Sequence, residues 1–354
     1  GADETNYFLQ YENKLAEART EMKALKMAYT GSKDDKSKKE MVSKQIKSLN
    51  SSMKKFLEQE NKRSTKFYSS FLKATTPVRL PDSLLGDRKD STIWIKQYMF
   101  MKEHYFDHID FSKSGFVRTP ILKRALDSYM NDILIPLPDS IGPALLGVIE
   151  KSKKNDDVYA YVANYLLTSS INSKIMGMDK VFVEIASMHQ LRSGQTLVDS
   201  INYKKIKDKV MAVVPNLLGG KAHNLHLQTP SGEDVALYDL AGRFHVVAFW
   251  DPNCSHCKTV IPELYQKVFT KYFGEGVDFW AVNTQQDVEK WKSFIKDKNI
   301  GDWTNVYDKY GNSLMHHYYN ITTTPKLFLL DNEMKIVAKN IGVETLISIL
   351  EEKL

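Results

Sequence analysis

Cysteine is almost absent from this chain of 354 residues, which contains two, Cys254 and Cys257. Two cysteines are too few for a disulfide-stapled scaffold or for a zinc site with four cysteine ligands. Because stray thiols mispair in oxidising compartments, the lack of any further cysteine favours an exported protein. The two cysteines lie three positions apart, and a lone pair with this spacing indicates redox chemistry.

The sequence also lacks a long apolar run and an N-terminal signal. No stretch reaches the roughly 18 apolar residues that would indicate a membrane span. The first five residues, Gly1–Thr5, have neither a basic start nor an apolar core. The chain opens within a helical pattern and without Met, so we interpret it as a processed or trimmed chain. The missing signal therefore tells us nothing about the compartment.

The formal net charge of +6 does not predict a nucleic-acid partner, because it is concentrated in one segment. Residues 31–66 hold eleven Lys or Arg and five Asp or Glu, an excess equal to that of the whole chain. Lysine-rich segments with few interleaved aromatic residues usually form a solvated helix face. We expect no nucleic acid here, and an acidic partner or a membrane surface is the alternative.

Residues 1–75 are predicted to form an amphipathic helical hairpin. Apolar residues recur every three or four positions in two runs, on either side of a polar break at residues 30–35. The runs contain Phe8, Tyr11, Leu15, Ala18, Met22, Leu25 and Tyr29, then Val42, Ile46, Leu49, Met53 and Phe56, and later Phe67 and Phe71. This spacing is typical of long helices with a narrow apolar seam. The helices either bury each other or dock onto a missing N-terminal domain or a second subunit.

Residues 76–215 are predicted to form an all-helical domain. Prolines and glycines separate five helix-like stretches, at residues 92–108, 120–131, 141–151, 158–170 and 178–192. We find no phosphate-binding glycine loop and no nucleophile elbow among them. His104 and His108 would share one helix face near Asp107 and Asp110, but two histidines do not define a site, and we predict no metal.

From residue 216 to 354 the pattern changes to alternating strands and helices. The apolar run Phe244–Trp250 is typical of a central strand buried on both faces. Further strands are predicted at residues 224–229, 277–283, 326–331 and 335–340, and helices at 259–272, 288–298, 313–319 and 343–353. This order predicts an α/β domain with a central mixed sheet.

The same segment carries a family resemblance. Its features, in order, are Asn224–Leu227, the pattern Leu237-x-Asp239-Leu240-x-Gly242, the strand into Trp250, the motif Cys254-Ser255-His256-Cys257, Pro262, and Thr324-Pro325 before an apolar strand. In these features the chain resembles the thioredoxin superfamily, in particular its TlpA/ResA-like branch. The resemblance implies a thioredoxin fold, a redox-active dithiol and no cofactor. The helical domain resembles, more loosely, an uncharacterised domain that precedes such modules in exported bacterial proteins.

The chemistry expected of the motif is thiol–disulfide exchange, in which a thiolate attacks a disulfide. Cys254 would lie at a helix N-terminus, where unpaired N–H groups favour negative charge, and is assigned as the attacking thiol. Cys257, one turn into the helix and less exposed, would resolve the mixed disulfide. His256 is expected to lower the pKa of Cys254; alternatively, it is a solvent-exposed spacer.

Two positions depart from the family pattern and leave the proton acceptor for Cys257 open. Thioredoxin has a buried acid six residues before its first cysteine, where this chain has Ala248, and ResA-like proteins often have a Glu where this chain has Val260. Glu263 and Asp251 are candidates, although each is more often a surface or capping residue. His256 or a water is the alternative.

The resemblance also implies a substrate-binding surface made of Thr324, Pro325 and Trp250. A cis Thr324–Pro325 bond would leave the Thr324 backbone free to pair with an extended peptide beside Cys254, and would keep a metal away from the dithiol. Trp250 would pack beneath the motif, as an ordinary core residue or with a direct influence on catalysis.

We therefore predict an exported thiol-disulfide oxidoreductase of the bacterial periplasm or cell envelope. Its partners would be protein thiols or disulfides and an electron donor or acceptor protein, with membrane anchoring through a missing N-terminus left open. His256 favours an oxidase or isomerase, whereas the TlpA/ResA-like lead-in favours a reductase. A binding or assembly protein with a thioredoxin scaffold is the alternative. A peroxidase is excluded, because Asp251 and Val247 replace the Thr and Pro of peroxiredoxins.

Overall fold

The computed structural model describes residues 2–32, 35–62, 67–87, 89–190 and 200–354. Its contacts divide the chain into two compact units. The first consists of residues 1–135 and 143–162, and the second of residues 136–142 and 163–354. These units do not coincide with the predicted domains 1–75, 76–215 and 216–354, and that division stays a prediction. Among the described residues, no helix combines the length and apolar character needed to cross a membrane.

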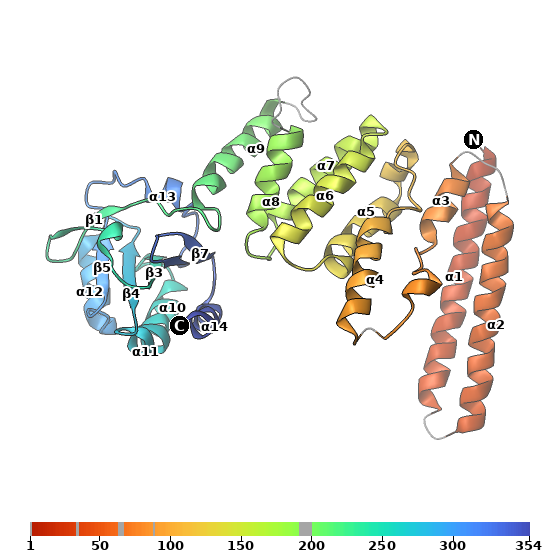
Figure 1. Cartoon of the computed structure of the whole chain (residues 1–354), viewed down its shortest axis with the longest axis horizontal. Coiled ribbons are helices and arrows are strands. Elements are labelled where there is room, and N and C mark those ends of the chain that lie inside the picture. The colour runs from red at the N-terminus through yellow and green to blue at the C-terminus, as the bar shows by residue number, and fades with distance from the viewer. Residues whose placement is uncertain (1, 33–34, 63–66, 88, 191–199) are drawn as a thin grey trace. The chain divides into compact units, whose positions relative to one another are not determined.

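The first unit begins with the helical hairpin. Helices α1 (Ala2–Gly31) and α2 (Lys36–Asn61) lie side by side, as Figure 1 shows in red and orange. The apolar seam faces inward, with Tyr11 buried at its N-terminal end. The periodicity that continued beyond α2 belongs to a separate helix, α3 (Tyr68–Thr75), where Tyr68 packs against Tyr11 in a small aromatic core. The aromatic end of the hairpin is therefore covered by α3, while Leu15, Ala18 and Met22 farther along the seam are only partly buried.

In the described part of the chain, α4 to α9 follow α3 and precede the sheet. Their bounds are α4 (Ser91–His104), α5 (Pro120–Ser128), α6 (Pro138–Ser152), α7 (Asp156–Ile171), α8 (Met178–Ile185) and α9 (Ser200–Val213). The first five correspond to the predicted helical stretches, whereas α9 was not predicted. Ile201 and Met211 of α9 are exposed, whereas Ile206, Val210 and Val213, which recur at helical spacing, are partly or fully buried.

Short elements complete the helical regions. Single 3₁₀ turns lie at Asp82–Leu84, Ser114–Arg118, Val214–Asn216 and Leu237–Asp239, and π-helical stretches at Tyr129–Ile133, Ala186–Gln190 and Tyr265–Phe269. The last of these follows Pro262, which lies inside α10 (Cys257–Leu264) and has no N–H to donate to the helix.

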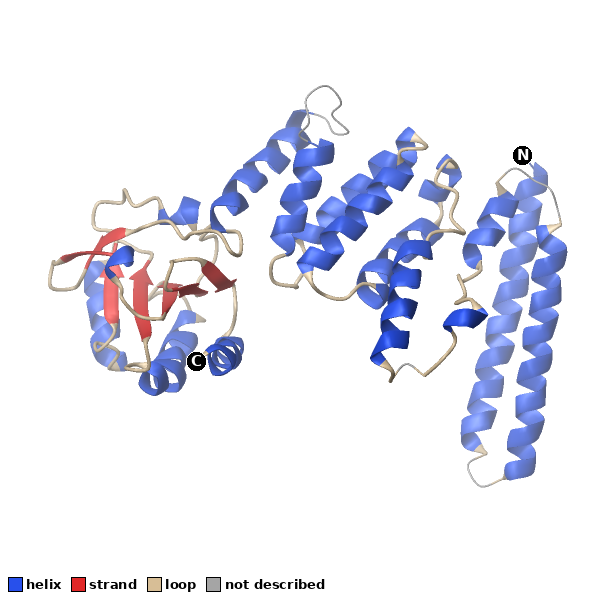
Figure 2. Cartoon of the chain, viewed as in Figure 1, coloured by secondary structure: helices blue, strands red, loops and turns tan. Residues whose placement is uncertain are grey.

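The second unit contains one mixed sheet of seven strands, drawn in red in Figure 2. They are β1 (His226–Gln228), β2 (Asp234–Ala236), β3 (Phe244–Trp250), β4 (Val277–Asn283), β5 (Thr304–Tyr307), β6 (Lys326–Asp331) and β7 (Ile336–Lys339). Their order is β2-β1-β5-β4-β3-β6-β7. Strand β3 pairs in parallel with β4 and antiparallel with β6, so it lies inside the sheet with a neighbour on each side.

Strand β3 is buried on both faces, which explains its continuous apolar sequence. Val246 and Trp250 belong to the core cluster that includes α10, α12 (Val288–Lys298) and α14 (Val343–Lys353). Val247 and Phe249 belong to the opposite cluster, with α13 (Met315–Tyr318) and the lead-in to β1. A three-residue helix, α11 (Thr270–Tyr272), completes the domain. The predicted thioredoxin fold, preceded by a helical hairpin and further helices, is confirmed.

Candidate active site

The turn between β3 and α10 presents Cys254. Asp251 shapes this turn in two ways. Its carboxylate accepts the N–H of Asn253 (2.7 Å), and its backbone carbonyl accepts the N–H of Cys254 (3.1 Å). The carbonyl of Cys254 then accepts the N–H of Lys258 (3.2 Å). The chain thus turns sharply at the end of a central strand and leaves the Cys254 thiol partly exposed.

Cys257 is the first residue of α10 and is fully buried. The sequence placed it one turn into the helix, and that detail is wrong because the Asp251 turn delays the helix start by three residues. Its predicted lower exposure is confirmed. Both cysteines are free thiols in this structure.

The environment of Cys254 favours the thiolate. Partial burial opposes ionisation, but the backbone N–H of Cys257, the Thr324 side chain, the Cys257 thiol and the backbone N–H of His256 outweigh it. As a result, the pKa of Cys254 lies below its ordinary value. When protonated, the same sulfur donates to the Thr324 carbonyl (3.3 Å). Cys254 is therefore the more readily ionised of the two thiols.

The environment of Cys257 favours the neutral thiol. Burial raises its pKa to about 11, and the neighbouring Cys254 adds to the rise, while the backbone of Asp251 opposes it. Cys257 therefore stays protonated under conditions in which Cys254 ionises. The two thiols of one motif thus differ in how readily they ionise, as the predicted attacking and resolving roles require.

The Thr324–Pro325 bond is cis, as the resemblance implies, and it immediately precedes β6. Both residues are half-buried, and the Thr324 carbonyl lies 3.3 Å from the Cys254 sulfur. The structure thus brings together Cys254, Cys257 and the Thr324–Pro325 loop, although they are far apart in the chain.

His256 is exposed at the N-cap of α10, where its side chain makes no capping hydrogen bond. Among the described residues, no hydrogen bond joins its imidazole to Cys254. The contribution that His256 makes to the thiolate comes from its backbone N–H. Tuning of Cys254 by the imidazole stays a prediction.

Trp250 is fully buried beneath the motif. Its ring lies 4.8 Å from that of Phe294, and it shares a core cluster with Cys257. Its backbone carbonyl accepts the N–H (2.9 Å) and the hydroxyl (3.1 Å) of Thr284. Trp250 therefore supports the motif from below, and a contact with substrate stays a prediction.

The candidate proton acceptors are engaged elsewhere. Glu263 pairs with Lys267 (2.8 Å), and the Asp251 carboxylate caps the Asn253 N–H. Ala248 is buried in the sheet and offers no acid. Among the described residues, no group of three or more His, Cys, Asp or Glu could hold a metal ion.

Sequence reasoning missed Lys326 and Lys339, two buried lysines near the Thr324–Pro325 loop. Both lie in otherwise apolar strands, and a charged residue inside such a strand is the signal that could have drawn attention to them. The partners of Lys339, which are Asp179 and Asn216, lie 160 and 123 positions away in the sequence and could not be foreseen.

Two family descriptions match the chain. Residues 218–339 match the AhpC/TSA family, and residues 89–216 match a domain of unknown function, DUF5106. The thiol-disulfide oxidoreductase ResA of Bacillus cereus is 27% identical over 128 residues, which are 36% of this chain and 72% of that protein.

Solved structures give further similarities. A thioredoxin-like protein from Bacteroides caccae has a TM-score of 0.63 at 18% identity, over 79% of this chain and 98% of that one. A domain of a possible thiol-disulfide isomerase from Cytophaga hutchinsonii is 36% identical, with a TM-score of 0.38, over 40% of this chain and 95% of that one.

The fold and the paired thiols define a thioredoxin-like dithiol protein. More particularly, the C-terminal part of the chain belongs to the thioredoxin-like proteins of the AhpC/TSA family and is homologous to ResA-type thiol-disulfide oxidoreductases.

Proposed function

We propose that this protein exchanges disulfides with protein substrates through Cys254 and Cys257 in the bacterial cell envelope. The observation that carries the proposal is the opposite environment of the two thiols. One is partly exposed with a lowered pKa, and the other is buried with a pKa raised to about 11. Exchange needs one ready nucleophile and one sulfur that waits until the first has reacted.

In the reducing direction, the Cys254 thiolate attacks one sulfur of a substrate disulfide. The substrate S–S bond breaks, its leaving thiolate takes a proton from solvent, and a mixed disulfide forms. Cys257 then gives up its proton and attacks the Cys254 sulfur, which releases the second substrate thiolate. Two electrons pass to the substrate, and Cys254 and Cys257 end as a disulfide. Oxidation of a substrate dithiol is the reverse sequence.

The mixed disulfide itself helps Cys257 to ionise. In the free dithiol, the charge on Cys254 contributes to the raised pKa of Cys257. That charge disappears when Cys254 enters the mixed disulfide, while the backbone of Asp251 still favours the Cys257 thiolate. Proton loss from Cys257 is thereby coupled to the arrival of substrate, and a water or His256 takes the proton.

The remaining parts of the proposal concern location and partners. The absence of cysteines other than Cys254 and Cys257 supports an exported protein. The dithiol is itself the redox centre, so no cofactor is needed, and an electron donor or acceptor protein would regenerate it. The helical regions would dock a substrate or partner.

Trapping of the mixed disulfide tests the proposal. A Cys257→Ser variant should accumulate a covalent adduct with a disulfide-containing protein such as insulin, because its resolving thiol is missing. A Cys254→Ser variant should form none, and Ser255→Ala is the matched control that should turn over normally. Equal behaviour of the two cysteine variants, or no reduction of insulin by the unmodified chain, would favour a passive scaffold instead.

A further inference from the structure

A polar cavity of about 820 Å³ lies beside the Thr324–Pro325 loop, within the second unit. Its walls are the segment from the end of α7 to the start of α8, the C-terminal end of α9, the loop into β6, and the chain that follows β7. The charged residues of its lining are Lys174, Lys209, Lys326, Lys339 and Asp179. Four cations thus face a single anion.

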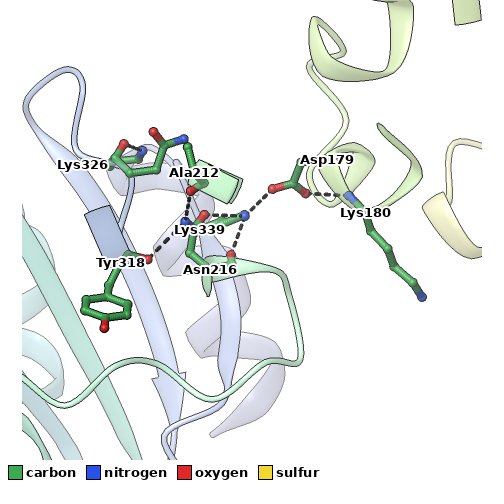
Figure 3. Close-up of polar contacts among 8 residues, drawn as sticks. Asp179, Lys180, Ala212, Asn216, Tyr318, Lys326 and Lys339 are labelled. Carbon is green, nitrogen blue, oxygen red and sulfur yellow. Dashed lines mark hydrogen bonds and ion pairs between the residues drawn. The ribbon is translucent and has the colours of Figure 1, made fainter. Parts of the chain in front are cut away.

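The single anion, Asp179, is already paired with Lys339, as Figure 3 shows. The ammonium of Lys339 donates to the Asp179 carboxylate and to both oxygens of Asn216, so its three donors are satisfied. Asn216 in turn donates to the carbonyls of Ala212 (3.0 Å) and Tyr318 (3.2 Å). Lys339 and Asp179 therefore form a closed structural network and leave no negative charge for the rest of the cavity.

Lys326 is the cation without an anion. It is 9% exposed, and within the described part of the chain its ammonium has one acceptor, the carbonyl of Asn320. Burial, followed by the nearby charges of Lys339 and Lys209, lowers its pKa to about 8, and Asp179 opposes this only weakly. A buried ammonium with spare donors and cationic neighbours gains from a negatively charged ligand.

The cavity adjoins the reactive sulfur. Thr323 and Pro325 line it, and they flank Thr324, whose carbonyl lies 3.3 Å from the Cys254 sulfur. A polypeptide joined to Cys254 would therefore lie beside the loop that forms part of the cavity wall. The exposed Lys174 and Lys209 would attract negative charge toward the cavity.

We propose that this cavity binds an acidic segment of the protein that exchanges disulfides with Cys254. A carboxylate of the segment accepts a hydrogen bond from Lys326, with Lys174 and Lys209 at the rim. The inference rests on the proposed function and adds to it a preference for acidic sequence beside the reacting cysteine. Its volume falls in the range of ligand pockets, so it accommodates side chains rather than a single ion.

The test uses the full chain and two disulfide-linked peptides that differ at the positions flanking the cysteine. One carries Asp and Glu, and the other carries Asn and Gln. We expect kcat/KM for reduction to be about tenfold higher for the acidic peptide at low ionic strength, as one charge-assisted hydrogen bond provides. The ratio should fall in high salt.

Variants of the cavity lysines test which residues cause the preference for the acidic peptide. Lys326→Met should bring the ratio close to one. The exposed pair Lys174→Gln and Lys209→Gln should lower it without disturbing the interior, which keeps the test valid if Lys326→Met fails to fold. Lys335→Gln is the matched control, because Lys335 lies in the turn between β6 and β7, outside the cavity, and pairs with Glu333. It should leave the ratio unchanged.

The pH dependence of the same ratio gives a second readout. Both peptides use the same thiols, so the thiolate content of Cys254 cancels. The ratio should decline as the pH rises through about 8, where Lys326 loses its charge; the charged groups that face Lys326 are Lys339, Lys209 and Asp179.

The outcomes separate the two proposals. Equal reduction of both peptides by the unmodified chain, or a ratio that survives both sets of lysine variants, would overturn the cavity proposal and leave the redox function intact. Failure to reduce either peptide would instead count against the redox function itself.

Discussion

At the scale of the residue, Cys254 and Cys257 have the same chemistry but different surroundings. Cys254 receives backbone N–H groups from the start of α10, whereas Cys257 lies in the core cluster that surrounds Trp250. Burial penalises a thiolate and N–H donors favour it, so the two pKa values move in opposite directions. The proposed order of events in the exchange reaction rests on this difference.

This difference predicts two alkylation profiles for the reduced protein. The reaction of Cys254 with iodoacetamide should reach half its maximal rate below the pH at which an ordinary thiol does, because the rate follows the thiolate. Cys257 should stay unmodified below about pH 10, since burial raises its pKa to about 11. Mass spectrometry of the labelled peptides distinguishes the two sites.

Two variants test what causes the alkylation profile of Cys254. Thr324→Val removes a side chain that favours the thiolate and should move the Cys254 profile to higher pH, whereas Ser255→Ala should not move it. Modification of Cys257 at neutral pH, or a Cys254 profile like that of a free thiol, would contradict the assigned roles.

At the scale of the element, Lys339 of β7 bonds to α8 and to the chain after α9. Its side chain is 3% exposed and that of Asp179 17%. Burial lowers the pKa of Lys339, although Asp179 acts in the opposite direction. The buried ammonium of Lys339 therefore joins the helical chain to the sheet of the second unit, and the carboxylate of Asp179 stabilises its charge.

We expect Asp179→Asn to lower the stability of this unit by about 2–3 kcal/mol, because it leaves a buried ammonium without its counter-ion. The matched control is Asp139→Asn, whose ion pair with Lys180 (2.7 Å) is exposed and should be worth less than about 1 kcal/mol. Urea unfolding followed by tryptophan fluorescence measures both. Equal losses in the two variants would show that the buried pair has no special role.

The sequence predicted the elements that are long or buried on both faces. Strands β3, β4 and β6 and helix α12 have the predicted bounds, because a continuous apolar run or a clear helical period marks them. It missed β2 and β5, which are three and four residues long, and helix α9, where the exposed Ile201 and Met211 weaken the amphipathic pattern. Short or unpatterned segments take their structure from tertiary contacts, which no local pattern records.

Some residues of the candidate site could likewise be predicted from the sequence, and others could not. The two cysteines and Thr324-Pro325 were found because they belong to a spaced motif. The pairing of Lys339 with Asp179 was not, because the two residues are 160 positions apart and each is unremarkable in its own segment. The charge balance of the cavity therefore emerged only from the structure.

At the scale of the whole molecule, the redox chemistry occupies one part of a largely helical chain. The hairpin of α1 and α2 belongs to the first unit, while α8 and α9 belong to the second together with the sheet. The helical sequence that matches DUF5106 thus lines part of the cavity beside the Thr324–Pro325 loop. We infer that α8 and α9 help to select the substrate.

The reduction potential of the Cys254–Cys257 couple tests the central claim most directly. It is measured on the full chain by thiol labelling in graded glutathione buffers. A catalytic dithiol predicts a potential between about −120 and −270 mV, with the oxidising end supporting a role for His256 and the reducing end a reductase. A potential below about −300 mV, as in a structural disulfide, or no disulfide at any buffer ratio, would contradict the account.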